Sequence, residues 1–385
     1  DGNTTCDYDA EEIKRQISIS LAFAPVMYKG KKINVMDAPG NFDFSGEAVC
    51  AIRAAECAVI VGNAKDGLSV GMERTWKMLG KKPRMMFINR VEEANSDYAS
   101  CIEAIKAKYG TAIAPIVATK ADGNKAVTVI VDLLHNKAYE VKGGKAAECA
   151  IPADIADEVE ALRAELMEAA AGADEELMEK FFGGEPFTTE EIVEGMRKGV
   201  KDGLITPVFC GSAVNQQALD MLLFNMHKLL PSPEHEASTL AEDAAGEPVE
   251  LHCTVDEPTA AYVFKTVADP FVGKLSYLRV VSGKVTAGEP LTNARTGDVE
   301  KISKPLTVIG KKQVDSDGII AGDIGAVAKL VSAKTGDTLC DAERVVKLPA
   351  PVFPKPSLFM AVTVAKKGDE GKISSALARL MEEDP

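Results

Sequence analysis

The chain of 385 residues has little histidine, little aromatic character and no Cys-x-x-Cys pair. Its four histidines are scattered, so their spacing gives no zinc site. Most of the eight cysteines stand within apolar patterns, so we expect buried thiols in a reducing compartment rather than disulfides. No apolar run approaches the roughly 20 residues that a membrane-spanning helix needs, and the polar start predicts no signal peptide.

An excess of positive charge is also absent. Lys+Arg 44 against Asp+Glu 58 gives a net charge of −14, which argues against nucleic-acid binding driven by net charge, although a local basic face stays open. The length allows two to four domains, and 46% apolar residues are typical of a globular protein. The chain does not begin with Met, and its last residues follow a helical pattern. We therefore expect a segment of a longer protein.

Residues 33–44 combine a short apolar run with Asp37, a Pro-Gly break and a helical pattern that begins at Phe42. A strand, Asp-x-x-Gly and a helix place a carboxylate and a backbone N–H at the carboxyl edge of a sheet, where ligands bind in open α/β folds. In nucleotide-dependent switches such an Asp holds Mg²⁺, usually through water, and the Gly N–H meets the γ-phosphate. The tetrapeptide alone is common by chance, so this interpretation needs partners elsewhere in the chain.

The segment before it alternates in polarity. Every second residue of 16–23 is apolar, which predicts a half-buried strand. A turn at 29–32 joins it to residues 33–36 as an antiparallel pair. Ser18 lies where a loop enters the predicted strand, so its hydroxyl could complete a Mg²⁺ site. A solvent-facing serine on a strand is the plainer interpretation.

Three further apolar runs alternate with helical patterns, which predicts a doubly wound parallel sheet. These runs occupy residues 58–64, 84–88 and 206–210. The second run leads to Asn89 and the third to Ser212. We expect the strand ends at Asp37, Asn89 and Ser212 to meet at one edge of one sheet.

The residues after the second run resemble an Asn-Lys-x-Asp sequence. Such a sequence recognises guanine because its carboxylate accepts hydrogen bonds from the ring N–H and the exocyclic amine. Here it reads Asn89-Arg90-Val91-Glu92. Arg90 keeps the cation and can stack on the base. Glu92 is one methylene longer than Asp, a misfit worth about 1–2 kcal/mol. The Gly-Ser-Ala sequence at 211–213 would offer backbone N–H groups to guanine O6.

Two parts of the chain depart from the pattern of the sheet. Residues of about 98–205 carry acidic helical patterns around an apolar run at 127–134, which predicts an α+β insertion within a first domain over 1–235. A polar linker follows at 236–249. Residues 250–349 show short strands with glycine turns and no long helix, which predicts a small closed β-barrel.

The last part of the chain, residues 352–385, predicts a further domain. An apolar run predicts a strand over 357–364, and a helical pattern follows over about 369–382. We expect these two elements to be the first strand and helix of that domain.

Taken together, these sequences resemble elongation factor G, a translational GTPase family, over all 385 residues. Residues 37–44 resemble the family's Asp-Thr-Pro-Gly-His-Val-Asp-Phe, and residues 15–19 resemble its Arg-Gly-Ile-Thr-Ile. The similar segments in the barrel and at the end of the chain, at 268–273, 336–340 and 380–385, are more specific, because every GTPase shares the nucleotide motifs.

The resemblance implies a P-loop-GTPase-type doubly wound α/β sheet with its insertion, an all-β translation-factor barrel and the start of a ferredoxin-like α+β domain. It implies GTP or GDP and Mg²⁺ as cofactors. Ser18 would bind the Mg²⁺ ion, Asp37 would hold it through water, and Asn41 would face the attacking water. It also implies GTP-dependent translocation of tRNA and mRNA by a cytoplasmic monomer that contacts rRNA and ribosomal proteins and no membrane. The implied nucleotide contacts are Asp37, Ala38, Pro39, Gly40, Asn41, Asn89, Arg90, Val91, Glu92, Ser212 and Ala213.

Two departures from the family concern nucleotide binding and catalysis. The glycine-rich phosphate loop with its Lys-Ser/Thr would precede Asp1, so we expect residues 1–385 by themselves to bind GTP poorly. Asn41 stands where the family carries a His that orients the attacking water, so we expect slow or absent hydrolysis. Two other interpretations stay open: a ribosome-binding paralogue that does not hydrolyse GTP, and a factor that removes an antibiotic from the ribosome.

Overall fold

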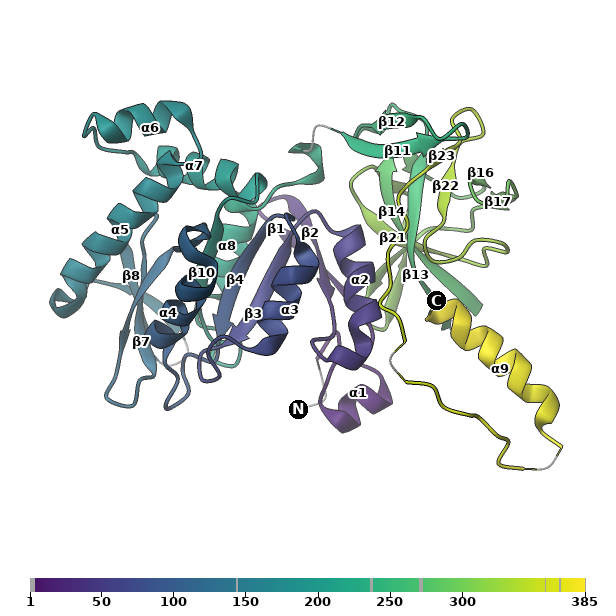
Figure 1. Cartoon of the computed structure of the whole chain (residues 1–385), viewed down its shortest axis with the longest axis horizontal. Helices are drawn as coiled ribbons and strands as arrows, with labels where there is room; N and C mark the ends of the chain where they lie inside the picture. Colours follow the sequence, from purple (N-terminus) through teal and green to yellow (C-terminus); the bar gives the residue numbers. More distant parts are fainter. Residues whose placement is uncertain are drawn as a thin grey trace. The chain divides into compact units, whose positions relative to one another are not determined.

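The computed structural model describes residues 4–142, 145–235, 238–269, 273–356, 358–366 and 368–384. The chain forms two compact units (Figure 1). The sheet unit is Glu56–Pro231, and the β-rich unit is Asp1–Ala55 together with Ser232–Pro385. The contacts therefore group the first 55 residues with the strands that follow the linker, whereas the predicted first domain runs over 1–235. None of the described helices is long and apolar enough to cross a membrane.

The sheet unit is built on four parallel strands in the order β3-β4-β10-β5. They are β3 (Ala58–Asn63), β4 (Arg84–Asn89), β5 (Ile113–Pro115) and β10 (Thr206–Cys210). The helices α3 (Val70–Leu79), α4 (Tyr98–Tyr109) and η2 (Gly110–Ala112) lie between these strands in the sequence, and α8 (Leu219–Leu229) follows β10. Strand β10 is buried along its whole length, as expected for a parallel strand covered on both faces. The predicted parallel sheet is confirmed.

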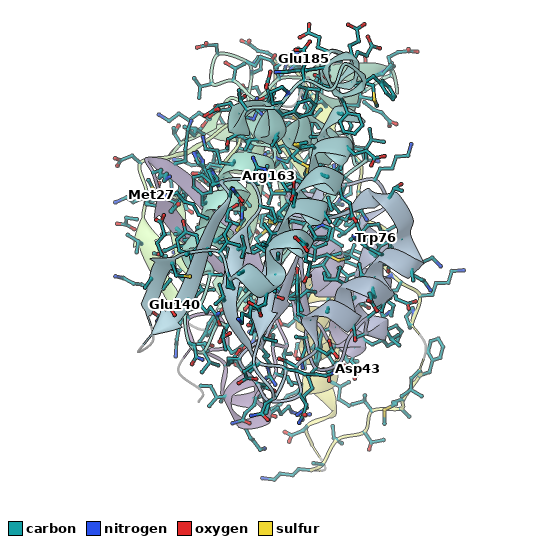
Figure 2. The ribbon with its side chains drawn as sticks, turned by 90° about the vertical axis from the view of Figure 1, so that its left-hand side faces the viewer. Met27, Asp43, Trp76, Glu140, Arg163 and Glu185 are labelled. Carbon is teal, nitrogen blue, oxygen red and sulfur yellow. The ribbon has the colours of Figure 1, made fainter. Side chains whose placement is uncertain are left out.

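An antiparallel sheet with three helices is inserted between β5 and β10. Its elements are β6 (Val117–Ala121), β7 (Val127–Asp132), β8 (Lys137–Lys142), β9 (Lys145–Cys149), η3 (Ala153–Ile155), α5 (Ala156–Ala171), α6 (Glu175–Phe182) and α7 (Thr189–Lys201). Arg163 of α5, which is labelled in Figure 2, donates a hydrogen bond to the carbonyl of Leu133 just after β7. Because β5 pairs with β10 in the parallel sheet, the inserted part begins after β5, and the predicted start near residue 98 is too early.

The β-rich unit contains an eight-stranded antiparallel sheet in the order β17-β16-β22-β13-β14-β21-β18-β19. Two small sheets, β15-β20 and β12-β11-β23, accompany it. The strands are β11 (Thr239–Asp243), β12 (Pro248–Leu251), β13 (Ala260–Asp269), β14 (Gly273–Ser282), β15 (Lys284–Val285), β16 (Pro290–Asn293), β17 (Val299–Lys301), β18 (Leu306–Ile309), β19 (Lys312–Asp315), β20 (Ile319–Ile320), β21 (Ile324–Ala328), β22 (Thr338–Cys340) and β23 (Val346–Lys347), after the short η4 (Pro233–His235). Residues 270–272, part of the family-like segment at 268–273, lie outside the described residues.

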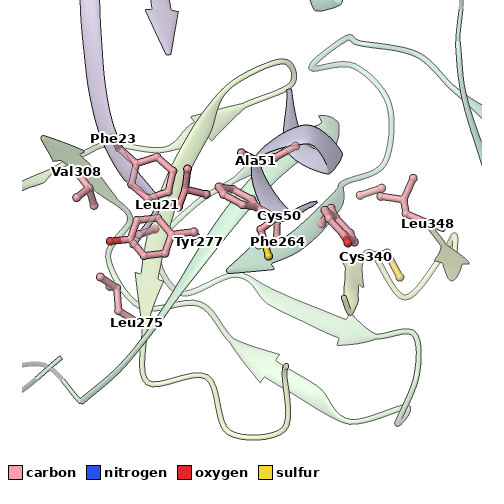
Figure 3. Packing of buried hydrophobic residues seen from close by; sticks show 14 of the residues in the cluster. Leu21, Phe23, Cys50, Ala51, Phe264, Leu275, Tyr277, Val308, Cys340 and Leu348 are labelled. Carbon is pink, nitrogen blue, oxygen red and sulfur yellow. The ribbon is translucent and has the colours of Figure 1, made fainter. Parts of the chain in front are cut away.

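Successive residues of β13 face two different cores, as the period of two of a strand requires. Ala261 and Val263 belong to a core formed by the β-rich strands themselves. Tyr262 and Phe264 belong to a second core, which includes side chains from the first 55 residues. The rings of Phe23 and Tyr277 stack there with their centroids 4.4 Å apart (Figure 3). This second core is the reason why the N-terminal segment belongs to the β-rich unit.

The N-terminal segment forms its own two-stranded antiparallel sheet. Its elements are α1 (Ala10–Arg15), β1 (Ala22–Tyr28), β2 (Lys31–Asp37), η1 (Phe42–Phe44) and α2 (Ser45–Ala54). The strand predicted over 16–23 is wrong in position, because β1 begins at Ala22. The Glu12 carboxylate accepts hydrogen bonds from the backbone N–H groups of Ile19 and Ser20 at 3.0 and 3.1 Å, so these two amides do not join a strand ladder.

The predicted helix near the end of the chain is present as α9 (Glu370–Glu383). The predicted strand over 357–364 is wrong for residues 358–364, which form no regular structure; Ser357 lies outside the described residues. A strand needs a hydrogen-bonded neighbour, and no described strand pairs with this segment. The side chains of Leu358 and Phe359 are 75% and 87% exposed.

Gly283 lies at a tightly packed position in the β-rich unit. Its φ of +74° disfavours any residue with a side chain, and an added Cβ would lie 2.5 Å from Thr259 Cα. We expect Gly283→Ala to lower the free energy of unfolding by about 3 kcal/mol, from backbone strain and overpacking together. Gly297→Ala is the matched control, because Gly297 has a φ of +77° and open space around its Cα. It should cost only about 1–2 kcal/mol. Urea denaturation measures both, and equal losses would contradict the prediction.

Candidate functional site

Asn89, the last residue of β4, joins two strand ends of the parallel sheet. Its Oδ1 accepts a hydrogen bond from the backbone N–H of Ala213 at 3.0 Å. Ala213 follows β10, and β4 and β10 pair in parallel with Ile88 opposite Cys210. The structure therefore brings together Asn89 and the Ser212-Ala213 turn, as the sequence predicts.

The turn after Asn89 is anchored at its centre. Arg90 takes a left-handed conformation with a φ of +64°, which is uncommon for a residue with a side chain. Val91 is fully buried, and its carbonyl accepts from the backbone N–H of Val127 at 2.8 Å. The Arg90 guanidinium is more than half exposed and lies 3.6 Å from the Glu93 carboxylate. The burial and the backbone hydrogen bond of Val91 therefore fix the middle of this turn, with Arg90 and Glu92 on either side.

Glu92 carries the most unusual polar atom of this turn. Its Oε2 is buried and has no hydrogen-bond partner among the described residues. An unpartnered buried carboxylate oxygen costs free energy that a ligand N–H would recover. A ligand that presents N–H donors is therefore the complement of this position.

Ser212 and Ala213 are engaged within the protein. The Ser212 side chain is fully buried, its Oγ accepts from the backbone N–H of Asn215 at 3.0 Å, and its own N–H donates to the Gln217 carbonyl at 3.1 Å. With Ala213 N–H on Asn89, neither amide is free for guanine O6 in this conformation, contrary to the expectation. The sequence did not point to Gln217, because no motif marks it. Its Nε2 is buried and has no hydrogen-bond partner among the described residues.

Asp37 lies at the end of β2 in the β-rich unit. The prediction that it ends a strand of the same sheet as Asn89 and Ser212 is wrong. Strand β2 pairs only with β1 among the described strands, with Ala22 opposite Asp37, and no described strand links β2 to the parallel sheet.

The residues after Asp37 form a turn that leads into a helix. Ala38 is half-buried and Pro39 is buried, whereas Gly40 and Asn41 are exposed. Asn41 precedes η1, and its side chain makes no capping hydrogen bond there. Its amide is therefore available to a ligand or a water molecule.

Ser18 is half-buried between α1 and β1, in the same unit as Asp37. Burial, and then the Asp7 carboxylate, raise the pKa of Asp37. Hydroxyl and carboxylate oxygens are ligands that suit Mg²⁺, and a cation would offset the crowding of negative charge around Asp37. The described residues hold no cluster of three or more His, Cys, Asp and Glu side chains suited to a metal.

A parallel sheet with these strand ends, followed by a β-rich domain, defines the translational GTPase class. The sequence matches the family "Elongation factor Tu GTP binding domain" over residues 1–232 and "Elongation factor G domain 2" over residues 258–342. The chain therefore belongs to the translational GTPase family, and its second domain is similar to that of elongation factor G. Guanine-nucleotide binding is the property that this GTPase domain implies.

The curated relatives agree with this assignment, and a solved structure has a similar fold. Elongation factor G of Ureaplasma parvum serovar 3 is 36% identical over 394 aligned residues, and that of Ureaplasma urealyticum serovar 10 is 35% identical over 393. Each alignment covers 100% of this chain and 56% of the relative, so the chain spans little more than half their length. A crystal structure of a protein from Thermus thermophilus superposes with a TM-score of 0.86 at 29% identity, covering 100% of this chain and 56% of that one.

Proposed function

We propose that this chain is the nucleotide-dependent part of a cytoplasmic, monomeric factor that drives GTP-dependent translocation of tRNA and mRNA. Its partners would be rRNA and ribosomal proteins, and the tRNA–mRNA complex indirectly. The similarity to elongation factor G over the whole chain supports this role. No observation favours removal of an antibiotic over this role.

The Glu92 carboxylate oxygen that has no hydrogen-bond partner among the described residues carries the proposal. Guanine presents a ring N–H and an exocyclic amine side by side, and a carboxylate can accept from both. Asn89 would keep the Ala213 turn beside the base through its 3.0 Å bond, and the exposed Arg90 guanidinium would stack on the ring. Adenine offers an unprotonated ring nitrogen at the corresponding position, so the same carboxylate would reject it.

The phosphate end of the nucleotide would meet the segment after β2. Gly40 N–H would face the γ-phosphate, Asn41 would hold the attacking water, and the Ala38-Pro39 turn would shape the approach. Ser18 and Asp37 would hold Mg²⁺, Asp37 through water. When bound, the ion neutralises phosphate charge.

A translocation assay tests this function. Purified ribosomes with peptidyl-tRNA in the A site are mixed with the full-length protein and GTP, and puromycin reactivity reports movement of that tRNA. We expect the reaction to accelerate with GTP and not with GDP. Equal rates with GTP, with GDP and without the protein would overturn the proposal.

A further inference from the structure

We propose that Glu47 is a positioning residue that ties two separate segments of the candidate phosphate site to strand β13. The segments are those that carry Ser18 and Gly40. The inference rests on the proposed function, because these residues face a nucleotide only if the protein binds one. The contact itself does not depend on a ligand.

One oxygen atom makes the connection. Glu47 Oε2 accepts a hydrogen bond from the backbone N–H of Leu21 at 2.6 Å and also pairs with the Lys265 ammonium. Glu47 lies in the first turn of α2, Leu21 directly precedes β1, and Lys265 lies within β13. Three elements that are far apart in the sequence therefore meet at one carboxylate.

Both segments are attached to this carboxylate by short stretches of chain. Leu21 is three residues from Ser18, a reach of roughly 10 Å at full extension. The stretch from Gly40 to Glu47 is mostly helical, in η1 and the start of α2, and is therefore stiff. Fixing Glu47 consequently restricts where both Ser18 and Gly40 can lie.

The surroundings make the contact strong. Lys265 is 5% exposed, and Leu21, Cys50 and Phe264 belong to the buried core beside it (Figure 3). Burial, with the Glu47 charge as a second cause, raises the pKa of the Cys50 thiol to about 12. In such poorly solvated surroundings an ion pair is strengthened, and one partner left alone is an uncompensated buried charge.

Hydrogen exchange of the purified protein without nucleotide tests the inference. In Lys265→Met, we expect exchange in residues 16–23 and 45–54 to become at least 10-fold faster, while residues 84–89 of the sheet unit keep their rate. The control is Lys32→Met, which breaks the partly exposed 2.8 Å pair of Lys32 with Asp323 in the same unit. It should change exchange in 16–23 by less than twofold. Unchanged exchange there in Lys265→Met would overturn the inference.

A double variant separates positioning from stability. Glu47→Gln with Lys265→Met removes both charges, so we expect its denaturation midpoint to return toward the original value. A positioning role predicts that residues 16–23 nevertheless stay less protected, because the methionine cannot hold the glutamine. Full return of protection in the double variant would show a structural role alone and overturn the inference. Failure of the full-length protein to bind nucleotide would instead overturn the proposed function and leave these exchange results standing.

Discussion

Replacing Asn41 with histidine is expected to raise ribosome-stimulated GTP hydrolysis by about 10²-fold or more. An imidazole can orient the attacking water and, when protonated, stabilise negative charge on the phosphate, whereas an asparagine amide can only hold the water. Asn41 is exposed and makes no side-chain cap with η1, so the replacement removes no contact that the helix uses. Release of labelled phosphate from GTP by the full-length protein at saturating ribosome concentration measures the rate.

The control for this experiment is Asn41→Gln, which keeps the amide and should give no gain. If Asn41→His gains nothing either, the residue is not the cause of slow hydrolysis. If the unchanged protein already turns over at the rate of a housekeeping elongation factor G, the hypothesis of slow hydrolysis itself fails. No gain in Asn41→His leaves a non-hydrolysing paralogue possible, whereas normal turnover by the unchanged protein excludes it.

Glu92→Gln is expected to weaken GDP binding by about 10²-fold, because two hydrogen bonds to a charged acceptor are lost or reversed. The glutamine amide offers a donor where guanine also presents donors. Xanthine carries a carbonyl in place of the exocyclic amine, so the variant should bind xanthosine diphosphate better than the original protein does. Equilibrium titration of the full-length protein with both nucleotides measures the change.

Two further variants serve as comparisons for Glu92→Gln. Glu92→Asp shortens the side chain to the length of the family residue and should tighten GDP binding by roughly 5- to 30-fold, the equivalent of about 1–2 kcal/mol. Glu103→Gln removes an exposed carboxylate from α4 in the same unit and should leave affinity unchanged. A Glu92→Gln variant that binds GDP as tightly as the original protein would refute the role of Glu92.

Local patterns predicted the parallel sheet well. The apolar runs that became β4 and β10 are long enough to be buried on both faces, and their ends carry Asn89 and Ser212. Because parallel strands share a carboxyl edge, the meeting of these residues followed from order alone, and the 3.0 Å bond between Asn89 and Ala213 agrees with it. The predicted place of Asp37 failed because strand order within a sheet depends on hydrogen-bonded neighbours, which no local pattern reveals.

Other features depended on pairs of residues that are distant in the sequence. Strand β1 begins later than predicted because the Glu12 carboxylate accepts hydrogen bonds from the backbone N–H groups of Ile19 and Ser20. The contact of Glu47 with Lys265 joins residues separated by 218 positions. Packing determines which hydrogen-bond partners a side chain meets. The sequence therefore shows that residue 47 is a glutamate, but not which groups its carboxylate will bind.

By itself the sequence determined the translational GTPase family, the parallel sheet, the β-rich domain and the residue types at the candidate nucleotide site, because each is written in runs and motifs a few residues long. Only the tertiary structure decided that the N-terminal segment packs with the β-rich strands and that Ala213 N–H is already bonded. It also decided that one Glu92 oxygen has no partner within the described part of the chain. These depend on burial and on partners brought together by folding, since a polar atom's state is set by its surroundings and not by its neighbours along the chain.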